Sequence, residues 1–219
     1  MAAVADHQVK QTAPVQMGTS GGNVKDISRA FCCSGTLGSV VTKGGSNYIL
    51  SNNHVLARTA QTAAEVAARV GEDISQPGLI DSGCRTTNSN IVADFSEAPR
   101  LGTQNVDAAL AATRSGQVDL TGAILEIGVP RQTPAAPSVG QAVAKSGRTT
   151  GLTCSAVGST NTDVSVQYQK GCNQGKKFVI SYNDQVVVNS SSFSAGGDSG
   201  SLIVTQANAA PVALLYAGS

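Results

Sequence analysis

The apolar residues of this 219-residue chain fall in short runs separated by turn-forming residues. Short apolar runs bounded by Gly, Pro, Asn and Ser are typical of strands in a sandwich or a barrel. The 24 glycines and an aromatic content of 4% favour the same all-β class. Residues 60–70, rich in Ala, Glu and Arg, have a helical composition, and we expect a surface helix or an ordered loop there. The expected strands cover residues 36–42, 48–50, 107–112, 123–127, 164–168, 177–182, 185–188, 202–205 and 212–216.

A proline-rich segment divides the chain. Three of the seven prolines fall within residues 129–138. Proline fixes φ and removes a backbone donor, so this segment cannot lie inside a sheet and is predicted to be a semi-rigid linker. A long surface loop in a single sandwich is the alternative.

One serine is displayed on a glycine-flanked turn. The sequence Gly-Asp-Ser-Gly at residues 197–200 runs into an apolar, strand-like segment. The Ser199 hydroxyl becomes a good nucleophile only if a neighbouring base takes its proton. The chain has two histidines, of which His7 lies in a polar N-terminal stretch and His54 follows an apolar run. We therefore expect His54 to be the base.

A catalytic histidine is oriented by a carboxylate, which also stabilises the imidazolium. Asp107 fits best because it leads directly into small apolar residues, a setting at the edge of a core, whereas Asp94 and Asp119 are the alternatives. The order along the chain is then His54, Asp107, Ser199. This order is that of the chymotrypsin arrangement and differs from the orders of two other large triad folds.

Each of these features has an ordinary interpretation when it stands alone. Gly, Asp and Ser are the usual turn formers, so the 197–200 sequence is also typical of a plain turn. A histidine after a strand is more often a core or edge residue than a catalyst, and an aspartate before an apolar run is often a cap. Their joint occurrence, once each and in one known order, favours catalysis.

From about Pro14 to its end, the chain resembles a bacterial trypsin-like serine peptidase of the chymotrypsin-fold, S1-type family. Residues 145–154 resemble the segment that opens the second barrel in secreted peptidases of the alpha-lytic kind. The resemblance implies two antiparallel β-barrels. Its expected divisions are an N-terminal segment (1–27), a first barrel with His54 and Asp107 (28–128), the linker (129–138) and a second barrel with Ser199 (139–219).

The resemblance also implies roles for residues around the nucleophile. The backbone N–H groups of Gly197 and Ser199 would form the oxyanion hole. The floor of the specificity pocket would lie near Phe193, which is neither acidic nor small, so we expect an apolar or small residue before the cleaved bond. The other expected pocket residues are Ser194, Tyr216, Ala217 and Gly218.

Asp198 needs a partner in such a site. In relatives activated by trimming, a newly formed N-terminal ammonium neutralises this carboxylate, but no Ile-Val-Gly-Gly-like start is present in this sequence. A buried unpaired carboxylate is costly, so another cation or a set of N–H donors must meet it. Arg148 is the expected partner, with an exposed Arg148 in a hairpin turn as the alternative.

The five cysteines are an odd set, so at least one is free or pairs outside the chain. The candidate bridges join Cys154 to Cys172, and Cys32 or Cys33 to Cys84. Five reduced thiols in a cytosolic protein are the alternative. The N-terminus shows no basic region followed by an apolar stretch, so no signal peptide is visible and we favour a cytoplasmic location over secretion.

Only twenty residues follow Ser199, whereas the family continues with a further strand and a terminal helix. We therefore expect a second barrel that lacks this strand and helix and stays open. The missing piece could be removed by cleavage, lie outside this sequence, or be supplied as a separate C-terminal fragment or a partner chain.

The remaining classes of function have no support in the sequence. A net charge of +1 without Lys/Arg clusters argues against nucleic acid and membrane surfaces, and no apolar run approaches the length of a membrane span. Two isolated histidines and no Cys-x-x-Cys pair leave no metal site, and no cofactor is expected. The expected partner is a protein or peptide substrate. The alternatives to a peptidase are a non-catalytic peptide-binding or scaffold protein of the same fold and a serine esterase.

Overall fold

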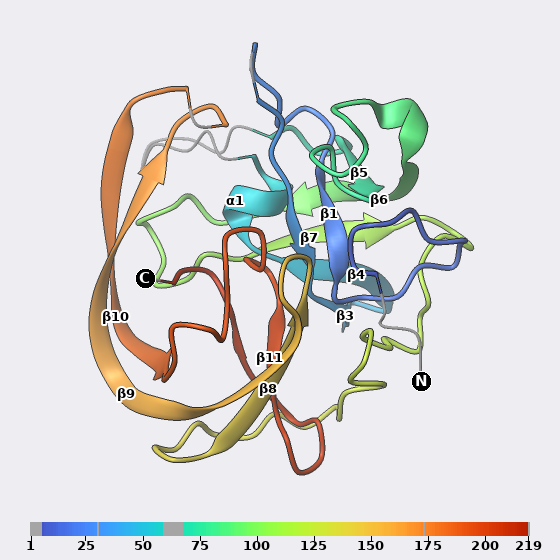
Figure 1. Cartoon of the computed structure of the whole chain (residues 1–219). Helices are drawn as coiled ribbons and strands as arrows, with labels where there is room; N and C mark the ends of the chain where they lie inside the picture. The colour runs from blue at the N-terminus through green and yellow to red at the C-terminus, as the bar shows by residue number, and fades with distance from the viewer. Residues whose placement is uncertain (1–5, 30, 59–67, 173, 219) are drawn as a thin grey trace.

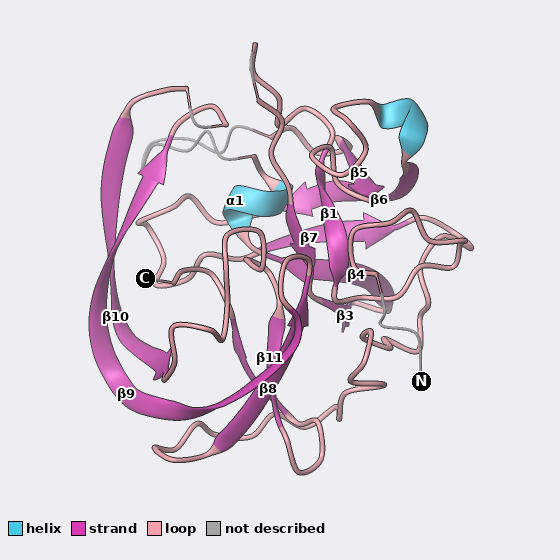
Figure 2. Cartoon of the chain, in the orientation of Figure 1, coloured by secondary structure: helices cyan, strands magenta, loops and turns pink. Residues whose placement is uncertain are grey.

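The computed structural model describes residues 6–29, 31–58, 68–172 and 174–218. These residues form two antiparallel sheets with very little helix, which confirms the expected all-β class (Figure 1; Figure 2). The described helices are the single turn α1 (Asn53–Leu56) and one 3-10 turn (Thr86–Asn88).

The first sheet has seven strands in the order β2-β1-β5-β6-β7-β4-β3. They are β1 (Thr19–Asn23), β2 (Gly35–Leu37), β3 (Ser39–Lys43), β4 (Ser46–Ser51), β5 (Asp73–Gln76), β6 (Asn90–Glu97) and β7 (Ala109–Thr113). The second sheet has five strands in the order β10-β9-β8-β11-β12. They are β8 (Ala142–Gly147), β9 (Gly151–Gln169), β10 (Lys177–Val188), β11 (Leu202–Thr205) and β12 (Pro211–Leu214).

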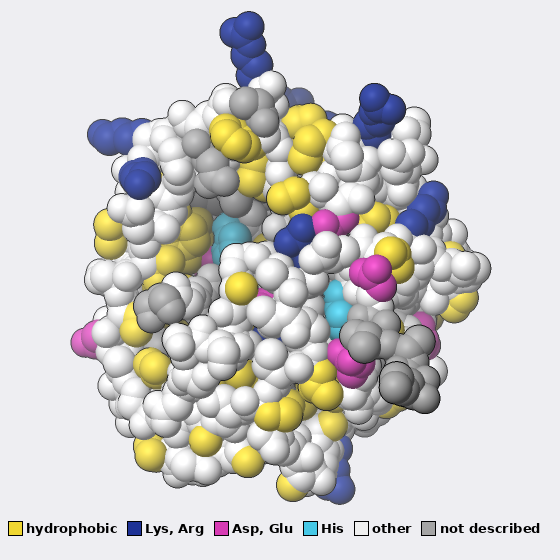
Figure 3. Space-filling model, viewed as in Figure 1, with side chains coloured by type: hydrophobic (Ala, Val, Ile, Leu, Met, Phe, Trp, Pro, Cys, Tyr) yellow, Lys and Arg dark blue, Asp and Glu magenta, His cyan; other side chains and the backbone are white. Residues whose placement is uncertain are grey.

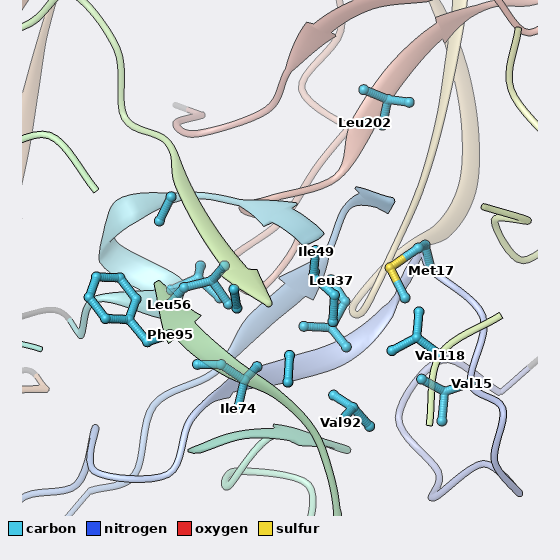
Figure 4. Close-up of a cluster of buried hydrophobic side chains, with 14 of the residues drawn as sticks. Val15, Met17, Leu37, Ile49, Leu56, Ile74, Val92, Phe95, Val118 and Leu202 are labelled. Atoms are coloured by element: carbon cyan, nitrogen blue, oxygen red, sulfur yellow. The ribbon is translucent and has the colours of Figure 1, made fainter. Parts of the chain in front are cut away.

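The larger hydrophobic core belongs to the first sheet (Figure 4). Leu202 and Val204 of β11 are part of the same cluster, although β11 lies in the second sheet. The strand that follows the Ser199 turn is therefore anchored on the core of the first sheet. The first-sheet side chains of this core include Leu37, Ile49, Ile74, Val92 and Phe95, each at most 2% exposed.

Two long strands shape the second sheet. The strands β9 and β10, 19 and 12 residues long, pair along most of their length and curve around one side of the molecule (Figure 1). Register shifts between Tyr182 and Val188 interrupt the regular ladder, and such bulges bend a strand pair. Two small clusters of buried side chains pack on this sheet. One consists of Leu101, Tyr168, Ile180 and Tyr182, and the other of Val143, Val157, Phe193 and Ile203.

Several expected elements are placed differently. The run at 36–42 divides at Gly38, because a Cβ there would lie 1.9 Å from the carbonyl oxygen of Gly200. Residues 123–127 form a turn and not a strand, because the Ile124 N–H bonds locally to Gly128 O at 2.9 Å. The strand β1 lies within the expected N-terminal segment 1–27 and pairs with β2 and β5. The helix expected at 60–70 falls mostly outside the described residues.

The linker expected at 129–138 contains no helix or strand. It runs beside the β11–β12 turn, where the Arg131 N–H donates to Ala209 O at 3.0 Å and the Ala135 N–H to Pro211 O at 2.8 Å. The domain boundaries themselves stay a prediction.

Two disulfides are present, and one differs from expectation. Cys32 is bonded to Cys84, one of the two bridges anticipated for Cys84. The bridge expected between Cys154 and Cys172 is wrong, because Cys172 is bonded to Cys33 and Cys154 is an exposed free thiol. Cys154 lies within the β8–β9 ladder opposite Ala144, whereas Cys172 lies in the β9–β10 turn.

Candidate active site

His54 lies in the helical turn α1, directly after β4. Asn52, the residue before this turn, donates a hydrogen bond from Nδ2 to the backbone carbonyl of Asp107 at 2.7 Å. The bond joins the end of β4 to the segment that leads into β7, its neighbour in the sheet. Strand pairing thus brings together two residues that are 53 positions apart in the sequence.

His54 and Asp107 form a close, largely buried pair. His54 Nδ1 lies 2.6 Å from Asp107 Oδ2, and the His54 backbone N–H donates to Asp107 Oδ1 at 3.3 Å. The Asp107 side chain is fully buried and that of His54 is 16% exposed. An ionised carboxylate can only accept hydrogen bonds, so Nδ1 carries the proton and Nε2 is left as the basic nitrogen.

Each of the two residues stabilises the charged form of the other. Burial disfavours both charged forms and alone would lower the pKa of His54 and raise that of Asp107. The attraction between them outweighs burial, so the Asp107 carboxylate raises the pKa of His54. The His54 ring and a hydrogen bond from the Tyr168 hydroxyl lower the pKa of Asp107. Asp107 is therefore ionised at neutral pH, and His54 is a stronger base than a free imidazole.

The alternative residues have other partners. Asp94 accepts hydrogen bonds from Arg114, with Arg114 Nη2 at 2.6 Å, and Asp119 accepts hydrogen bonds from Thr121. His7 is buried rather than exposed, but its two ring nitrogens lie 2.6 Å from Gly18 O and 2.9 Å from a Glu126 oxygen. His7 therefore attaches the N-terminal segment to Gly18 and Glu126.

The Ser199 turn packs against β2, near the residue that follows His54. The Thr36 N–H donates to Ser199 O at 2.8 Å. A Cβ placed on Gly35 would meet both a methyl group of Val55, at 2.5 Å, and Ser199 O, at 2.9 Å. The residue after His54 and the backbone of Ser199 thus lie on two sides of one glycine. The Ser199 residue is half-buried, and its hydroxyl makes no hydrogen bond to another described residue, His54 included.

The backbone around Ser199 presents two unused donors. Gly197 has a φ of +102°, in the region that favours glycine, and the Asp198 N–H turns back to Ala195 O at 3.0 Å. Within the described part of the chain, no acceptor meets the N–H of Gly197 or that of Ser199. Two such donors beside a serine hydroxyl are the groups that an oxyanion hole requires.

Asp198 is buried, and its partner is not the expected one. Its carboxylate accepts hydrogen bonds from the Thr149 N–H at 2.8 Å, the Ala195 N–H at 2.9 Å and the Thr150 hydroxyl at 2.7 Å. The nearby cation is Lys145, whose Nζ lies 3.6 Å from Asp198 Oδ2, with both side chains fully buried. Burial would raise the pKa of Asp198, but these donors and Lys145 together lower it.

The expected pairing of Arg148 with Asp198 is therefore wrong. The Arg148 guanidinium makes a two-point contact with Asp81, with Nε and Nη2 each 2.6 Å from a carboxylate oxygen. A third contact joins Arg148 Nη1 to the Thr149 hydroxyl at 3.0 Å, and that hydroxyl donates to Gly196 O at 2.7 Å. The planar fork of Arg148 is thus satisfied by the two carboxylate oxygens of Asp81.

A cavity of about 540 Å³ opens beside the Ser199 turn. Leu215, in its wall, accepts a hydrogen bond from the Gly200 N–H at 2.8 Å, so one wall is bonded to the turn itself. None of the described residues that line it is charged. Its lining includes all five residues expected for the specificity pocket, Phe193, Ser194, Tyr216, Ala217 and Gly218, and valines of β9 and β10 at 164, 166, 186, 187 and 188.

Comparison with solved structures identifies the fold. Similar structures include a glutamic-acid-specific serine protease (19% identity, 94% of this chain and 86% of that chain, TM-score 0.60). Thermobifida fusca protease A (15% identity, 94% and 84%, TM-score 0.57) and an alpha-lytic protease homologue (21% identity, 93% and 85%, TM-score 0.55) are also similar. The chain has the chymotrypsin fold. No protein-family model matches the sequence, and no curated protein matches it.

Two residues of this chymotrypsin-fold site were not anticipated. Lys145 lies in a strand between apolar and small residues, and a lone lysine in such a run is the signal that could have marked a buried cation. Tyr168 lies near the end of β9, and nothing in its surrounding sequence points to Asp107, 61 positions away.

Other kinds of site are not formed by the described residues. None of their His, Cys, Asp and Glu side chains gather in a group that could hold a metal ion. No described helix is long and apolar enough to cross a membrane. On the face shown in Figure 3, Lys and Arg side chains lie apart from one another and form no basic cluster.

Proposed function

We propose that this chain is a serine endopeptidase of the chymotrypsin fold. Ser199 Oγ attacks the carbonyl carbon of a peptide bond while His54 Nε2 takes the hydroxyl proton. His54 then returns that proton to the leaving amine, and a water molecule, activated in the same way, hydrolyses the acyl-enzyme. Asp107 keeps the imidazole in the required tautomer and stabilises its charged form.

The observation that carries this proposal is the buried His54–Asp107 pair at 2.6 Å, set in a fold shared with serine proteases. The turn that bears Ser199 and the residue after His54 lie on two sides of Gly35, and the N–H groups of Gly197 and Ser199 meet no acceptor among the described residues. The hydrogen bond between serine and histidine is often loose in a site without substrate and tightens when substrate binds. A bound peptide would place its carbonyl oxygen at the N–H groups of Gly197 and Ser199.

The cavity beside the turn supports an apolar residue before the cleaved bond. A volume of about 540 Å³ accommodates a large side chain, and the lining offers no opposite charge to Lys, Arg, Asp or Glu. Burying a charge without a partner costs several kcal/mol, so charged residues at this position are disfavoured.

An active-site fluorophosphonate probe tests the proposal. We expect covalent labelling of Ser199, loss of labelling in Ser199→Ala and His54→Ala, and normal labelling in the matched control Ser192→Ala, an exposed serine of the same loop. If the probe labels the protein, its rates of turnover of peptide and ester substrates then separate a peptidase from an esterase. A folded protein that the probe does not label at Ser199 would refute the proposal and favour a peptide-binding role.

A further inference from the structure

Tyr168 reaches from the second sheet to the His54–Asp107 pair in the first. Its hydroxyl lies 2.7 Å from Asp107 Oδ2, the same oxygen that contacts His54 Nδ1. Both Tyr168 and Asp107 are buried, at 9% and 4% exposure, so water cannot replace this hydrogen bond easily. The contact is therefore part of the environment that decides where the carboxylate sits.

The ring of Tyr168 is also held on both sides. It packs edge-on against the His54 ring, with centroids 5.8 Å apart, and stacks on Phe178 at 5.7 Å. Its hydroxyl oxygen lies 2.8 Å from the hydroxyl of Tyr182 on β10. A phenylalanine at position 168 would keep the ring contacts and lose only the hydrogen bonds.

The direction of the hydrogen bonds follows from the number of protons. An ionised Asp107 can only accept, so the single hydroxyl proton of Tyr168 points to Asp107. The Tyr182 hydroxyl must then donate to the Tyr168 oxygen. Burial, together with the nearby Asp107 charge, raises the pKa of Tyr168 far above neutral pH, so this donor keeps its proton throughout the working range. The result is a chain of donors from Tyr182 through Tyr168 to Asp107.

We propose that Tyr168 is a positioning residue of the site. Its hydroxyl, which comes from the second sheet, donates to the Asp107 carboxylate and holds it in place, so that Tyr168 and His54 share the negative charge of Asp107. A donor on Oδ2 withdraws charge from the atom that faces the imidazole and limits rotation of the carboxylate. The proposal rests on the proposed peptidase function for its catalytic consequence, although the geometry itself involves only the described residues.

Removing the hydroxyl has a definite electrostatic sign. Without the Tyr168 donor, the negative charge on Asp107 Oδ2 is less stabilised and attracts the protonated His54 ring more strongly. The pKa of His54 therefore moves upward in Tyr168→Phe. The other titratable groups whose charges act on the pair are Asp26, Tyr182 and Tyr216. The substitution leaves Asp26 and Tyr216 untouched and removes the hydrogen-bond acceptor of the Tyr182 hydroxyl.

The experiment is a titration of the histidine rings by NMR in the full chain. The sequence has only two histidines, so the second set of resonances belongs to His7, and Tyr168→Phe should leave that set as it is in the native protein. We expect the His54 midpoint to rise in Tyr168→Phe, to rise less in Tyr182→Phe, and to be unchanged in the control Tyr48→Phe. The kcat/KM at neutral pH should fall about tenfold in Tyr168→Phe, the loss expected for a hydrogen bond to a charged group.

An unchanged or lowered His54 midpoint in Tyr168→Phe would overturn the proposal, whatever the change in thermal stability. A merely structural role would lower the melting temperature and leave the midpoint in place. The NMR readout does not depend on turnover, so a raised midpoint in a chain that the fluorophosphonate probe fails to label would sustain the role of Tyr168 and refute the peptidase assignment alone.

Discussion

At the scale of single residues, the basicity of His54 has a kinetic consequence. In the proposed mechanism the ring must be neutral to accept the Ser199 proton, so we expect activity to be low at acid pH and to rise as the pH passes the His54 pKa. Because the Asp107 carboxylate raises that pKa, the acid limb of kcat/KM should have its midpoint above about 6.5, the value of an unperturbed histidine. A pH–rate profile measures it directly.

The matched variant is Asp107→Asn, which keeps the size of the side chain and removes its charge. Its acid limb should move to lower pH, and kcat should fall about ten-thousandfold, as it does when such an acid is replaced in a comparable triad. An acid limb at the same pH in both proteins would mean that a group other than His54 controls the rate.

A second prediction at this scale separates Lys145 from Arg148. Lys145→Met leaves the fully buried Asp198 carboxylate without its nearby cation, and breaking a buried ion pair costs about 3 kcal/mol or more. We expect a lower free energy of unfolding in urea and a marked loss of kcat, because Asp198 bonds the turn that carries the two N–H groups proposed to form the oxyanion hole.

Arg148→Met is the control, since Arg148 contacts Asp81 and not Asp198. It should reduce kcat much less than Lys145→Met does. If the two variants lose equal activity, the Asp81–Arg148–Thr149 contacts and not the Lys145 cation hold the turn in shape.

At the scale of elements, the chain order and turn chemistry of the site were readable from the sequence, and the long pairings were not. The Gly-Asp-Ser-Gly turn at 197–200 and the strand before His54 are local patterns. In contrast, β9 continues through polar residues from Gly151 to Gln169, and neither its length nor its partner can be read from apolar runs. The strand β1, with two glycines among five residues, has no strand-like composition at all. Both are strands because neighbours satisfy their backbone groups.

The wall of the cavity depends on these long strands. Valines of β9 and β10 line the cavity together with Phe193 and Tyr216. The kcat/KM of peptide substrates with Phe or Leu before the cleaved bond should therefore exceed that of matched peptides with Lys or Glu by about a hundredfold or more, since burying a charge without an opposite charge costs several kcal/mol. A series of peptides that differ only at this residue measures the ratio.

Gly218 offers a matched test of the same wall. A Cβ at this position would lie 3.0 Å from Ser194 Oγ, across the cavity lining. Gly218→Val should narrow the pocket and reduce kcat/KM for the Phe peptide more than for an Ala peptide. Equal reductions for both peptides would show that this cavity does not hold the residue before the cleaved bond.

At the scale of the whole molecule, the sequence could not specify how the two sheets are tied together. Five cysteines allow many pairings, and which ones meet depends on the path of β9 and β10. The observed Cys33–Cys172 bridge joins the segment before β2 to the β9–β10 turn, and so links the two sheets covalently. Cys172 follows Tyr168 by four positions, which places the bridge close in sequence to the donor on Asp107.

The two disulfides should differ in how much they stabilise the protein. Cys33–Cys172 spans 139 residues and Cys32–Cys84 spans 52, so on the chain-entropy model they restrict the unfolded chain by about 5 and about 4 kcal/mol. Both double variants to Ala should lower the urea midpoint, Cys33→Ala/Cys172→Ala somewhat more.

Their activities should differ further. Only the Cys33–Cys172 bridge connects the β9–β10 hairpin, and with it Tyr168, to the sheet that carries His54 and Asp107. We therefore expect kcat/KM, measured well below the unfolding transition, to fall in Cys33→Ala/Cys172→Ala and to stay near the native value in Cys32→Ala/Cys84→Ala. Equal kcat/KM in the two variants would mean that non-covalent contacts between the sheets suffice to hold Tyr168 at Asp107, among them the packing of Leu202 and Val204 on the first core, which neither change touches.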